Sequence, residues 1–422
     1  MPDGGSLRRI DAGSPFRVLL LLPSLHGGGA ERVAVHLLNK CDPGILNVRL
    51  GLLQRTGPYL RDADPDRICS SPIGERLLTF EGSNSSFYRP DRLLAGAMLA
   101  PVNTALMVRA FQPDVIMSCL KGMSLITYAA RGLMGPDRPR WIAREGNNSD
   151  AVIEDEVASP LGRRMVKGAI RRCYAAADCV LANSRDMATG LRTGLGLDRS
   201  RLRVVHNPID VELVRRRAAE SAPGLPDRPY IVSVGRLEFQ KGHDLLLRAF
   251  AASPACRDMD LLILGKGSLE QALRAQAAAL GVADRVRFVG FVDNPWAYMS
   301  KARLFVLPSR WEGFPNIVCE ALAAGVPALV SDCAYGPSEI VDHGQSGWVA
   351  PPGEVGALTA GLEHLLRHPD LSARLARRGQ ERVLRFDIQE MVRAYTSLFV
   401  EQAMTRRPTI ARREEVLQFA ES

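Results

Sequence analysis

Short apolar runs recur along the chain, without the alternation of a half-exposed strand. They include VLLLL at 18–22 and DVIMSCL at 114–120 in the first half, and DLLILG at 260–265 and LFVLPS at 304–309 in the second. Such runs are typical of strands covered on both faces, as in a parallel sheet, and the longer stretches between them supply the crossover helices that parallel strands need. The sequence therefore predicts an α/β fold with parallel sheets.

The runs form two series, and 422 residues exceed what one hydrophobic core usually holds. Between the series, residues 215–229 are polar and contain Pro223, Gly224, Pro226 and Pro229, as an interdomain linker does. We predict a disordered terminus at 1–14, a first domain at 15–222 and a second at 223–385. Each domain is expected to be a doubly wound parallel sheet.

Charge and cysteine usage restrict the partners and the compartment. The formal net charge of +8 favours anionic partners, but no nucleic-acid-binding motif is present, so nucleic acid is not an expected partner. Eight cysteines without a CxxC pair indicate a reducing, cytoplasmic location.

The apolar stretch 93–108 contains Pro101 and is shorter than the about 20 residues of a membrane span, so we expect a buried helix. Peripheral attachment to a membrane through basic residues 163–172 stays open, as does a merely solvated helix.

A glycine-rich turn follows the first strand. Gly28 and Gly29 come before a helical pattern, and a helix N-terminus with close backbone approach suits a phosphate. A tight turn without a ligand is the alternative. In the second domain, Gly265 and Gly267 also predict close backbone approach, there to a base or a ribose.

Two cations follow the first strand of the second domain. Arg236 and Lys241 stand five residues apart at the carboxyl end of that strand, where ligands bind in open parallel sheets. A guanidinium beside an ammonium suits a diphosphate, because charge-assisted hydrogen bonds are the strong ones. Surface cations on a solvated loop are the alternative.

Two carboxylates, Glu312 and Glu320, are eight residues apart. Gly313 and Pro315 place Glu312 in a loop and Glu320 on a helix that begins near Asn316, so both can face one crevice. Carboxylates accept hydrogen bonds from sugar hydroxyls, and the first NH groups of the helix can bind a phosphate. The alternative is a helix-dipole partner and a surface acid.

These features together resemble glycosyltransferase family 4, the glycosyl transferases group 1, whose members carry Glu, seven residues, Glu. The resemblance spans most of 18–399 through GRLEFQKGHDLLLRAF, FVLPSRWEGFPNIVCEALAAGVPALVSD and SGWVAPPG. It implies a GT-B fold, in which two Rossmann-like domains face each other across a cleft. It also implies that helices from about 386 to 422 return to the first domain.

The resemblance implies roles for individual residues. Arg236, Lys241 and Glu312 would be catalytic, with the two cations on the donor diphosphate and Glu312 on the donor sugar. Glu320 would bind the ribose. Further donor contacts are expected from the following residues: Gly28, Gly29, Gly265, Gly267, Gly313, Phe314, Pro315, Asn316 and Ile317. On the acceptor side the sequence departs from the better-known members, and the candidates are Lys121, Arg144 and Glu145; a structural ion pair between the last two is the alternative.

The implied activity is retaining transfer of a hexosyl unit from a nucleotide diphosphate sugar. A UDP sugar is our first expectation and GDP-mannose our second, with a saccharide or lipid-linked saccharide as acceptor at the cytoplasmic membrane face. We expect neither a cofactor nor a metal, because the two cations can neutralise the leaving diphosphate. The alternatives are another GT-B activity, such as a sugar-nucleotide epimerase or a phosphorylase, and a non-catalytic partner in glycan assembly.

Overall fold

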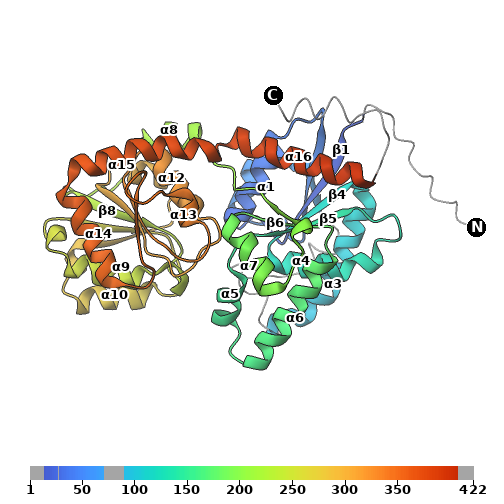
Figure 1. The fold of residues 1–422 in the computed structure, drawn as a ribbon, viewed down its shortest axis with the longest axis horizontal. Coiled ribbons are helices and arrows are strands. Elements are labelled where there is room, and N and C mark those ends of the chain that lie inside the picture. Colours follow the sequence, from blue (N-terminus) through green and yellow to red (C-terminus); the bar gives the residue numbers. More distant parts are fainter. Residues whose placement is uncertain (1–13, 27, 71–89, 407–422) are drawn as a thin grey trace, which may run out of the picture.

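In this computed structural model, residues 14–26, 28–70 and 90–406 are described, with the backbone alone for 90–98 and 149. The terminus predicted to be disordered lies outside these residues except for Ser14, and so does the segment 407–422. The described chain forms two α/β lobes side by side, and its last two long helices follow one another along the top of the molecule, the first on one lobe and the second on the other (Figure 1).

The first lobe contains a parallel sheet in the order β3-β2-β1-β4-β5-β6-β7. Its strands are β1 (Phe16–Leu22), β2 (Leu46–Leu52), β3 (Ile68–Ser70), β4 (Val115–Cys119), β5 (Arg140–Glu145), β6 (Cys179–Ala182) and β7 (Leu202–Val204). Six of these match apolar runs of the sequence. The edge strand β3 was not predicted, because its sequence, Ile-Cys-Ser, is not a continuous apolar run.

Helices cover both faces of this sheet, and the apolar runs are continuous for that reason. Val18 and Leu20 of β1 face one buried cluster, while Leu19 and Leu21 face another. The covering helices are α1 (Gly29–Lys40), α3 (Pro90–Phe111), α4 (Lys121–Ala130), α5 (Ser149–Glu156), α6 (Pro160–Ala176) and α7 (Arg185–Leu195).

The second lobe repeats the design with a parallel sheet in the order β10-β9-β8-β11-β12-β13. Its strands are β8 (Tyr230–Val234), β9 (Asp260–Leu264), β10 (Val286–Gly290), β11 (Leu304–Leu307), β12 (Ala328–Ser331) and β13 (Trp348–Ala350). Its helices are α9 (His243–Ala252), α10 (Glu270–Ala279), α11 (Pro295–Met299), α12 (Asn316–Ala324), α13 (Pro337–Ile340), α14 (Val355–Arg367) and α15 (Pro369–Arg382). All six strands were predicted, and the doubly wound α/β fold class is confirmed.

The chain passes from the first lobe to the second before the predicted boundary at 222. Helix α8 (Val211–Ala218) buries Val211 and Val214 in the core of the second lobe, so the passage lies at about 205–210. The polar, proline-rich segment that suggested the boundary connects α8 to β8 within that lobe.

The chain returns beside this first passage. The Ile209 NH donates to the Phe386 carbonyl at 3.0 Å, and the Ile388 NH donates to the Ile209 carbonyl at 2.9 Å. Helix α16 (Ile388–Arg406) then packs Tyr395 and Phe399 into the core of the first lobe. Both connections therefore lie at one place between the lobes.

Helix α3 contains the apolar stretch that raised the membrane question. Its described side chains include buried Met107 and Val108, but Val102 and Leu106 are exposed. No helix in the described part of the chain is both long and apolar enough to cross a bilayer.

Candidate functional site

The strand order of the second sheet reverses between β8 and β11, and ligands bind outside the carboxyl ends of strands at such a point. Arg236 follows β8, Lys241 ends the short helix η6 (Phe239–Lys241), and Glu312 follows β11. Gln240 links the loop after β8 to the loop after β11. Its side-chain oxygen accepts from Arg236 at 3.3 Å, and its side-chain nitrogen donates at 2.9 Å to the carbonyl of Trp311, the residue before Glu312. The three residues predicted to be catalytic therefore lie at one edge of the sheet.

Lys241 and Glu312 form an ion pair. The Lys241 Nζ donates to Glu312 Oε1 at 2.6 Å, and the Ser309 hydroxyl donates to the same oxygen at 2.7 Å. Glu312 is only 5% exposed, and its hydrogen bond from Lys241 is a charge-assisted one. Among the described residues both bonds go to Oε1, which leaves Oε2 for a ligand hydroxyl. Arg236 is exposed and faces solvent with its charge.

Gly265 and Gly267 pack against the loop that carries Arg236. A Cβ on Gly265 would lie 1.9 Å from the Gly235 carbonyl oxygen, and one on Gly267 would lie 2.4 Å from the Leu237 carbonyl oxygen. Gly265 also has φ +140°, which L side chains rarely adopt. The close backbone approach that we predicted here is to the protein's own loop.

The N-terminus of α12 faces the first lobe. The Asn316 side chain accepts from Asn207 at 2.7 Å, and its Nδ2 lies 3.2 Å from where a Cβ on Gly29 would stand. Gly28 is the N-cap of α1, so the two helix N-termini approach each other across the cleft. Their partial positive charges suit an anion between them. Phe314 is buried in the second core, so it can reach a ligand only through its backbone.

Glu320 lies one turn inside α12, with both of its oxygens bonded. The Trp296 indole NH donates to Oε2 at 2.7 Å. Arg32, from the first turn of α1, donates to Oε1 across the cleft. Sequence reasoning missed Arg32 and Trp296. Arg32 stands within the glycine-rich segment already singled out, and a cation in the first turn of a helix, against the helix dipole, was a usable signal.

The acceptor-side candidates Lys121 and Glu145 lie together at the carboxyl ends of β4 and β5. The Lys121 Nζ is 3.5 Å from Glu145 Oε1, and the Tyr174 hydroxyl donates to Oε2 at 2.7 Å. The NH groups of Gly146 and Asn147 donate to Oε1. Glu145 is buried and is thereby held in one orientation.

Arg144 is 1% exposed and does not reach the cleft surface. It donates to the Asn207 side chain at 2.5 Å and to the Tyr395 hydroxyl at 3.1 Å. It therefore joins β5 to the passage between the lobes and to α16. This geometry favours a structural role over acceptor binding.

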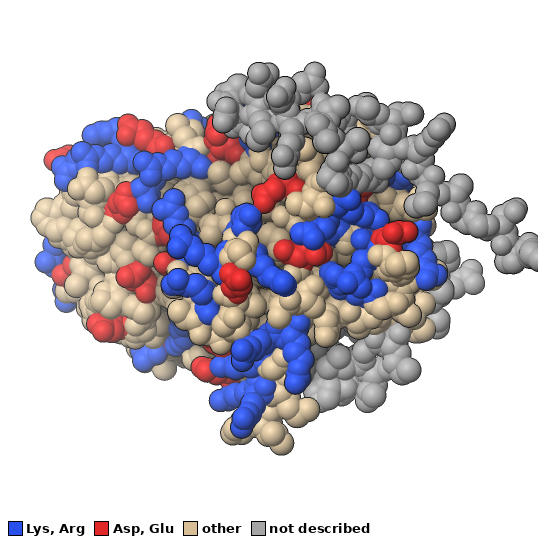
Figure 2. Space-filling model, turned by 45° about the vertical axis from the view of Figure 1, so that its right-hand side comes forward, with Lys and Arg blue, Asp and Glu red and all other residues tan. Residues whose placement is uncertain are grey.

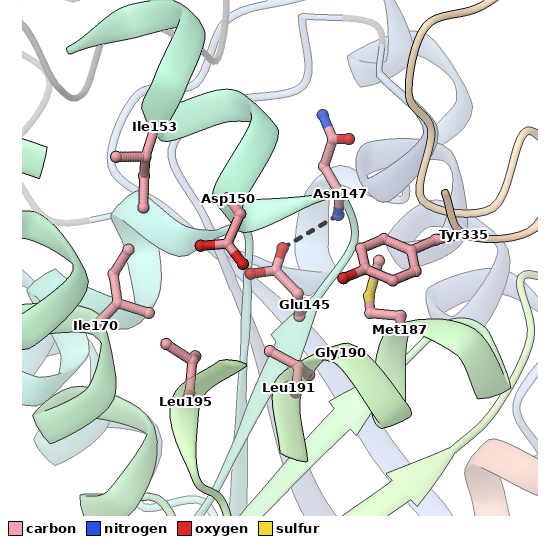
Figure 3. Close-up of a pocket in the computed structure, with 10 residues that line it drawn as sticks. All are labelled: Glu145, Asn147, Asp150, Ile153, Ile170, Met187, Gly190, Leu191, Leu195 and Tyr335. Carbon is pink, nitrogen blue, oxygen red and sulfur yellow. Dashed lines mark hydrogen bonds between the residues drawn. The ribbon is translucent and has the colours of Figure 1, made fainter. Parts of the chain in front are cut away.

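A cavity of about 10 Å³, room for about one water, lies between Glu145 and Tyr335 (Figure 3). Tyr335 reaches it from the loop after β12 with φ +72°, and a Cβ on Gly190 of α7 would lie 2.1 Å from its hydroxyl oxygen. Burial raises the pKa of the Tyr335 hydroxyl, and the nearby carboxylates of Asp150 and Glu145 add to the rise. The second lobe thus inserts an aromatic ring into the first lobe beside an acceptor-side candidate.

Two family models match the chain, one on each lobe. The model described as Glycosyltransferase Family 4 matches residues 27–213, and the model described as Glycosyl transferases group 1 matches residues 216–382. The two matches meet close to the passage between the lobes.

Curated relatives and solved structures agree with these matches. An N-acetylgalactosamine-N,N'-diacetylbacillosaminyl-diphospho-undecaprenol 4-alpha-N-acetylgalactosaminyltransferase of Campylobacter jejuni is 29% identical over 61% of this chain and 72% of its own length. The lipopolysaccharide core biosynthesis glycosyltransferase LpsE of Rhizobium meliloti is 30% identical over 52% of this chain and 64% of its own length. HepE of Anabaena, solved in complex with UDP and glucose, has a TM-score of 0.71 at 19% identity, covering 92% of this chain and 100% of that one. That likeness shows the shared fold.

Proposed function

The chain belongs to glycosyltransferase family 4, and from that premise we propose that it moves a hexosyl unit, with retained anomeric configuration, from a nucleotide diphosphate sugar to a saccharide or lipid-linked saccharide. The glycosyltransferases that this chain resembles share the GT-B fold and use a nucleotide sugar. The observation that carries the proposal is the Lys241–Glu312 pair beside exposed Arg236. This arrangement supports the proposal, because cations suit a diphosphate and a carboxylate accepts hydrogen bonds from a sugar hydroxyl.

In the proposed reaction the acceptor hydroxyl oxygen bonds to the anomeric carbon on the face from which the diphosphate leaves. As that bond forms, the bond from the anomeric carbon to the diphosphate oxygen breaks, and the hydroxyl proton passes to a leaving phosphate oxygen. Arg236 and Lys241 would neutralise the leaving group, and Glu312 would orient the sugar. An NMR measurement of the product's anomeric configuration tests retention, since an inverted product contradicts this scheme.

For the donor we propose a UDP sugar first and GDP-mannose second. The first choice is supported by HepE of Anabaena, a GT-B protein that binds UDP and glucose. A ligand that binds only the folded protein stabilises it by about 2.7 kcal/mol at a hundredfold excess over Kd. We therefore expect UDP or its sugars to raise the midpoint of thermal unfolding, with ADP as the control. A panel of UDP and GDP compounds that leaves the midpoint unchanged contradicts the proposal.

The lipid-linked form of the proposed acceptor would be met at the cytoplasmic face of a membrane. Helix α6 supports this: Leu161 and Met165 are about 70% exposed on it. The same helix carries five basic residues, which are Arg163, Arg164, Lys167, Arg171 and Arg172. Lys and Arg gather on the lowest part of the molecule in Figure 2, where Figure 1 places α6. Exposed apolar side chains flanked by cations suit the surface of an anionic bilayer.

Vesicle flotation tests the membrane proposal. The double variant Arg164→Glu/Arg171→Glu is expected to lose binding to vesicles that contain phosphatidylglycerol, since each cation near such a surface contributes about 1 kcal/mol. The matched control is Arg374→Glu/Arg377→Glu on α15, where both side chains are exposed on the second lobe. Equal loss in the two variants would mean that net charge, and not α6, controls the binding.

Incubation with radiolabelled donor separates transfer from the other GT-B activities. Labelled product is expected only when an acceptor is present. Interconversion of free nucleotide sugars without acceptor would instead identify an epimerase.

A further inference from the structure

Arg32 belongs to the first lobe but bonds to the carboxylate proposed to hold the donor ribose. It lies in the first turn of α1, three residues after Gly29, and its Nη1 donates to Glu320 Oε1 on α12 of the other lobe. The two residues are 288 positions apart in the sequence. The pair therefore exists only when the lobes approach each other.

Both ends of the pair are fixed by aromatic side chains. On the first lobe, the Tyr59 hydroxyl accepts from Arg32 Nε at 3.1 Å and from Nη2 at 2.7 Å. On the second lobe, the Trp296 indole NH holds the other oxygen of Glu320. The result is a continuous chain of hydrogen bonds, Tyr59 to Arg32 to Glu320 to Trp296, across the cleft.

Because Glu320 is buried, losing its ion pair with Arg32 would be costly. The Glu320 side chain is 4% exposed, whereas that of Arg32 is 32% exposed. The Glu320 carboxylate raises the pKa of Arg32 above its usual range. Among the described residues, a Glu320 carboxylate that lost this cation would keep only the neutral Trp296 donor, and an under-compensated buried charge is unfavourable.

The remaining acceptor capacity of Glu320 decides what Arg32 does. A carboxylate has about four lone-pair sites on two oxygens, and Arg32 and Trp296 use one on each. Two sites are left for the paired hydroxyls of a ribose. Arg32 approaches from the side of α1, so it can orient the carboxylate while a ribose binds to it.

We propose that Arg32 is a positioning residue for the donor nucleoside: it fixes the Glu320 carboxylate from the opposite lobe, so that ribose recognition and closure of the cleft occur together. The proposal rests on the proposed function, because the ligand of Glu320 is taken to be a ribose. It implies that the first lobe contributes to nucleotide affinity without touching the nucleotide through this side chain.

The test compares ligands with and without a ribose. UDP and GDP are titrated calorimetrically into the wild-type protein and into Arg32→Ala and Arg32→Lys, with inorganic pyrophosphate as the ribose-free probe. Loss of a hydrogen bond to a charged group predicts affinity of Arg32→Ala for the nucleoside diphosphate about 10- to 100-fold weaker, with pyrophosphate binding unchanged. Arg32→Lys, which can reach Glu320 but lacks the planar fork for Tyr59, is expected to recover part of the loss.

Two controls separate positioning from a general effect on the fold. In a Glu320→Ala background, adding Arg32→Ala should cause no further loss, because the two residues act as a unit. Arg61→Ala removes an exposed ion pair between the lobes, to Asp293, and should leave nucleotide binding unchanged. If Arg32→Ala does not fold, Arg32→Lys in the two backgrounds carries the same comparison.

Each other outcome overturns the inference in a recognisable way. Equal weakening of pyrophosphate and nucleotide would mean that Arg32 contacts the phosphates. Unchanged nucleotide affinity, or a full additional loss in the Glu320→Ala background, would mean that Arg32 does not act through Glu320. A wild-type protein that binds pyrophosphate alone, or none of the three ligands, overturns the proposed donor as well.

Discussion

Lys241→Met is expected to slow sugar transfer by about a hundred- to thousandfold. Lys241 is the cation that bonds directly to Glu312, and the proposed reaction places its charge against the leaving diphosphate. Removing a preorganised donor from developing negative charge has an effect of this size in other enzymes. The measurement is the initial rate with saturating donor and acceptor.

The same substitution affects stability, because it leaves the Glu312 carboxylate buried with the Ser309 hydroxyl as its remaining donor among the described residues. Breaking a buried ion pair lowers the free energy of unfolding by about 3–5 kcal/mol. Because the Lys241 side chain is 15% exposed, we expect a loss toward the lower end of this range. The double variant Lys241→Met/Glu312→Gln removes the unpaired charge, so it should recover stability while remaining inactive. Lys301→Met, at an exposed lysine of the same lobe, is the control for both measurements. A Lys241→Met protein with wild-type turnover would remove Lys241 from the site.

Gly313→Ala is expected to reduce turnover by about a hundredfold. A Cβ on Gly313 would lie 2.1 Å from the Gly146 carbonyl oxygen of the first lobe, and backbone cannot move aside as a side chain can. The lobes must separate by about 1 Å to admit the methyl group, and a misplacement of that size costs about 100-fold in rate. The fold of the second lobe should persist, because Gly313 is not among the glycines with positive φ.

The measurement for Gly313→Ala pairs turnover with the radius of gyration from small-angle scattering in the presence of donor. Lower turnover with a larger radius is the expected pair of results. Gly356→Ala on α14 is the matched control, because nothing lies within 4 Å of its added methyl group. Full turnover in Gly313→Ala would show that the reaction does not need the contact between Gly313 and Gly146.

Local pattern was sufficient to predict the two sheets, because their central strands bury both faces and leave continuous apolar runs. The resemblance to glycosyltransferase family 4 predicted that Arg236, Lys241 and Glu312 would share a site, and the structure brings them together at one edge of the second sheet. The short strand β3 and the early passage into the second lobe were missed. Each depends on tertiary packing, of β3 against β2 and of Val214 in the second core, which leaves no local signal.

Contacts between the lobes could not be predicted from spacing. Arg32 meets Glu320, and Tyr335 reaches Gly190, only through the relative placement of two bodies that each fold around their own core. Arg144 was also beyond prediction, because its partners Asn207 and Tyr395 come from the passage between the lobes and from the last helix. Whether Gly28, Asn316 and the remaining donor residues contact a ligand stays a prediction.

The paired connections at Ile209 and Phe386–Ile388 restrict how this molecule can open. A single connection would let one lobe rotate freely about it, but two connections joined by hydrogen bonds resist twisting and act as a hinge. When the lobes open, residues far from this hinge move furthest, and residues beside it barely move. Substitutions near Ile209 should therefore change how often the molecule opens, and substitutions at the far rim should change how long it stays shut.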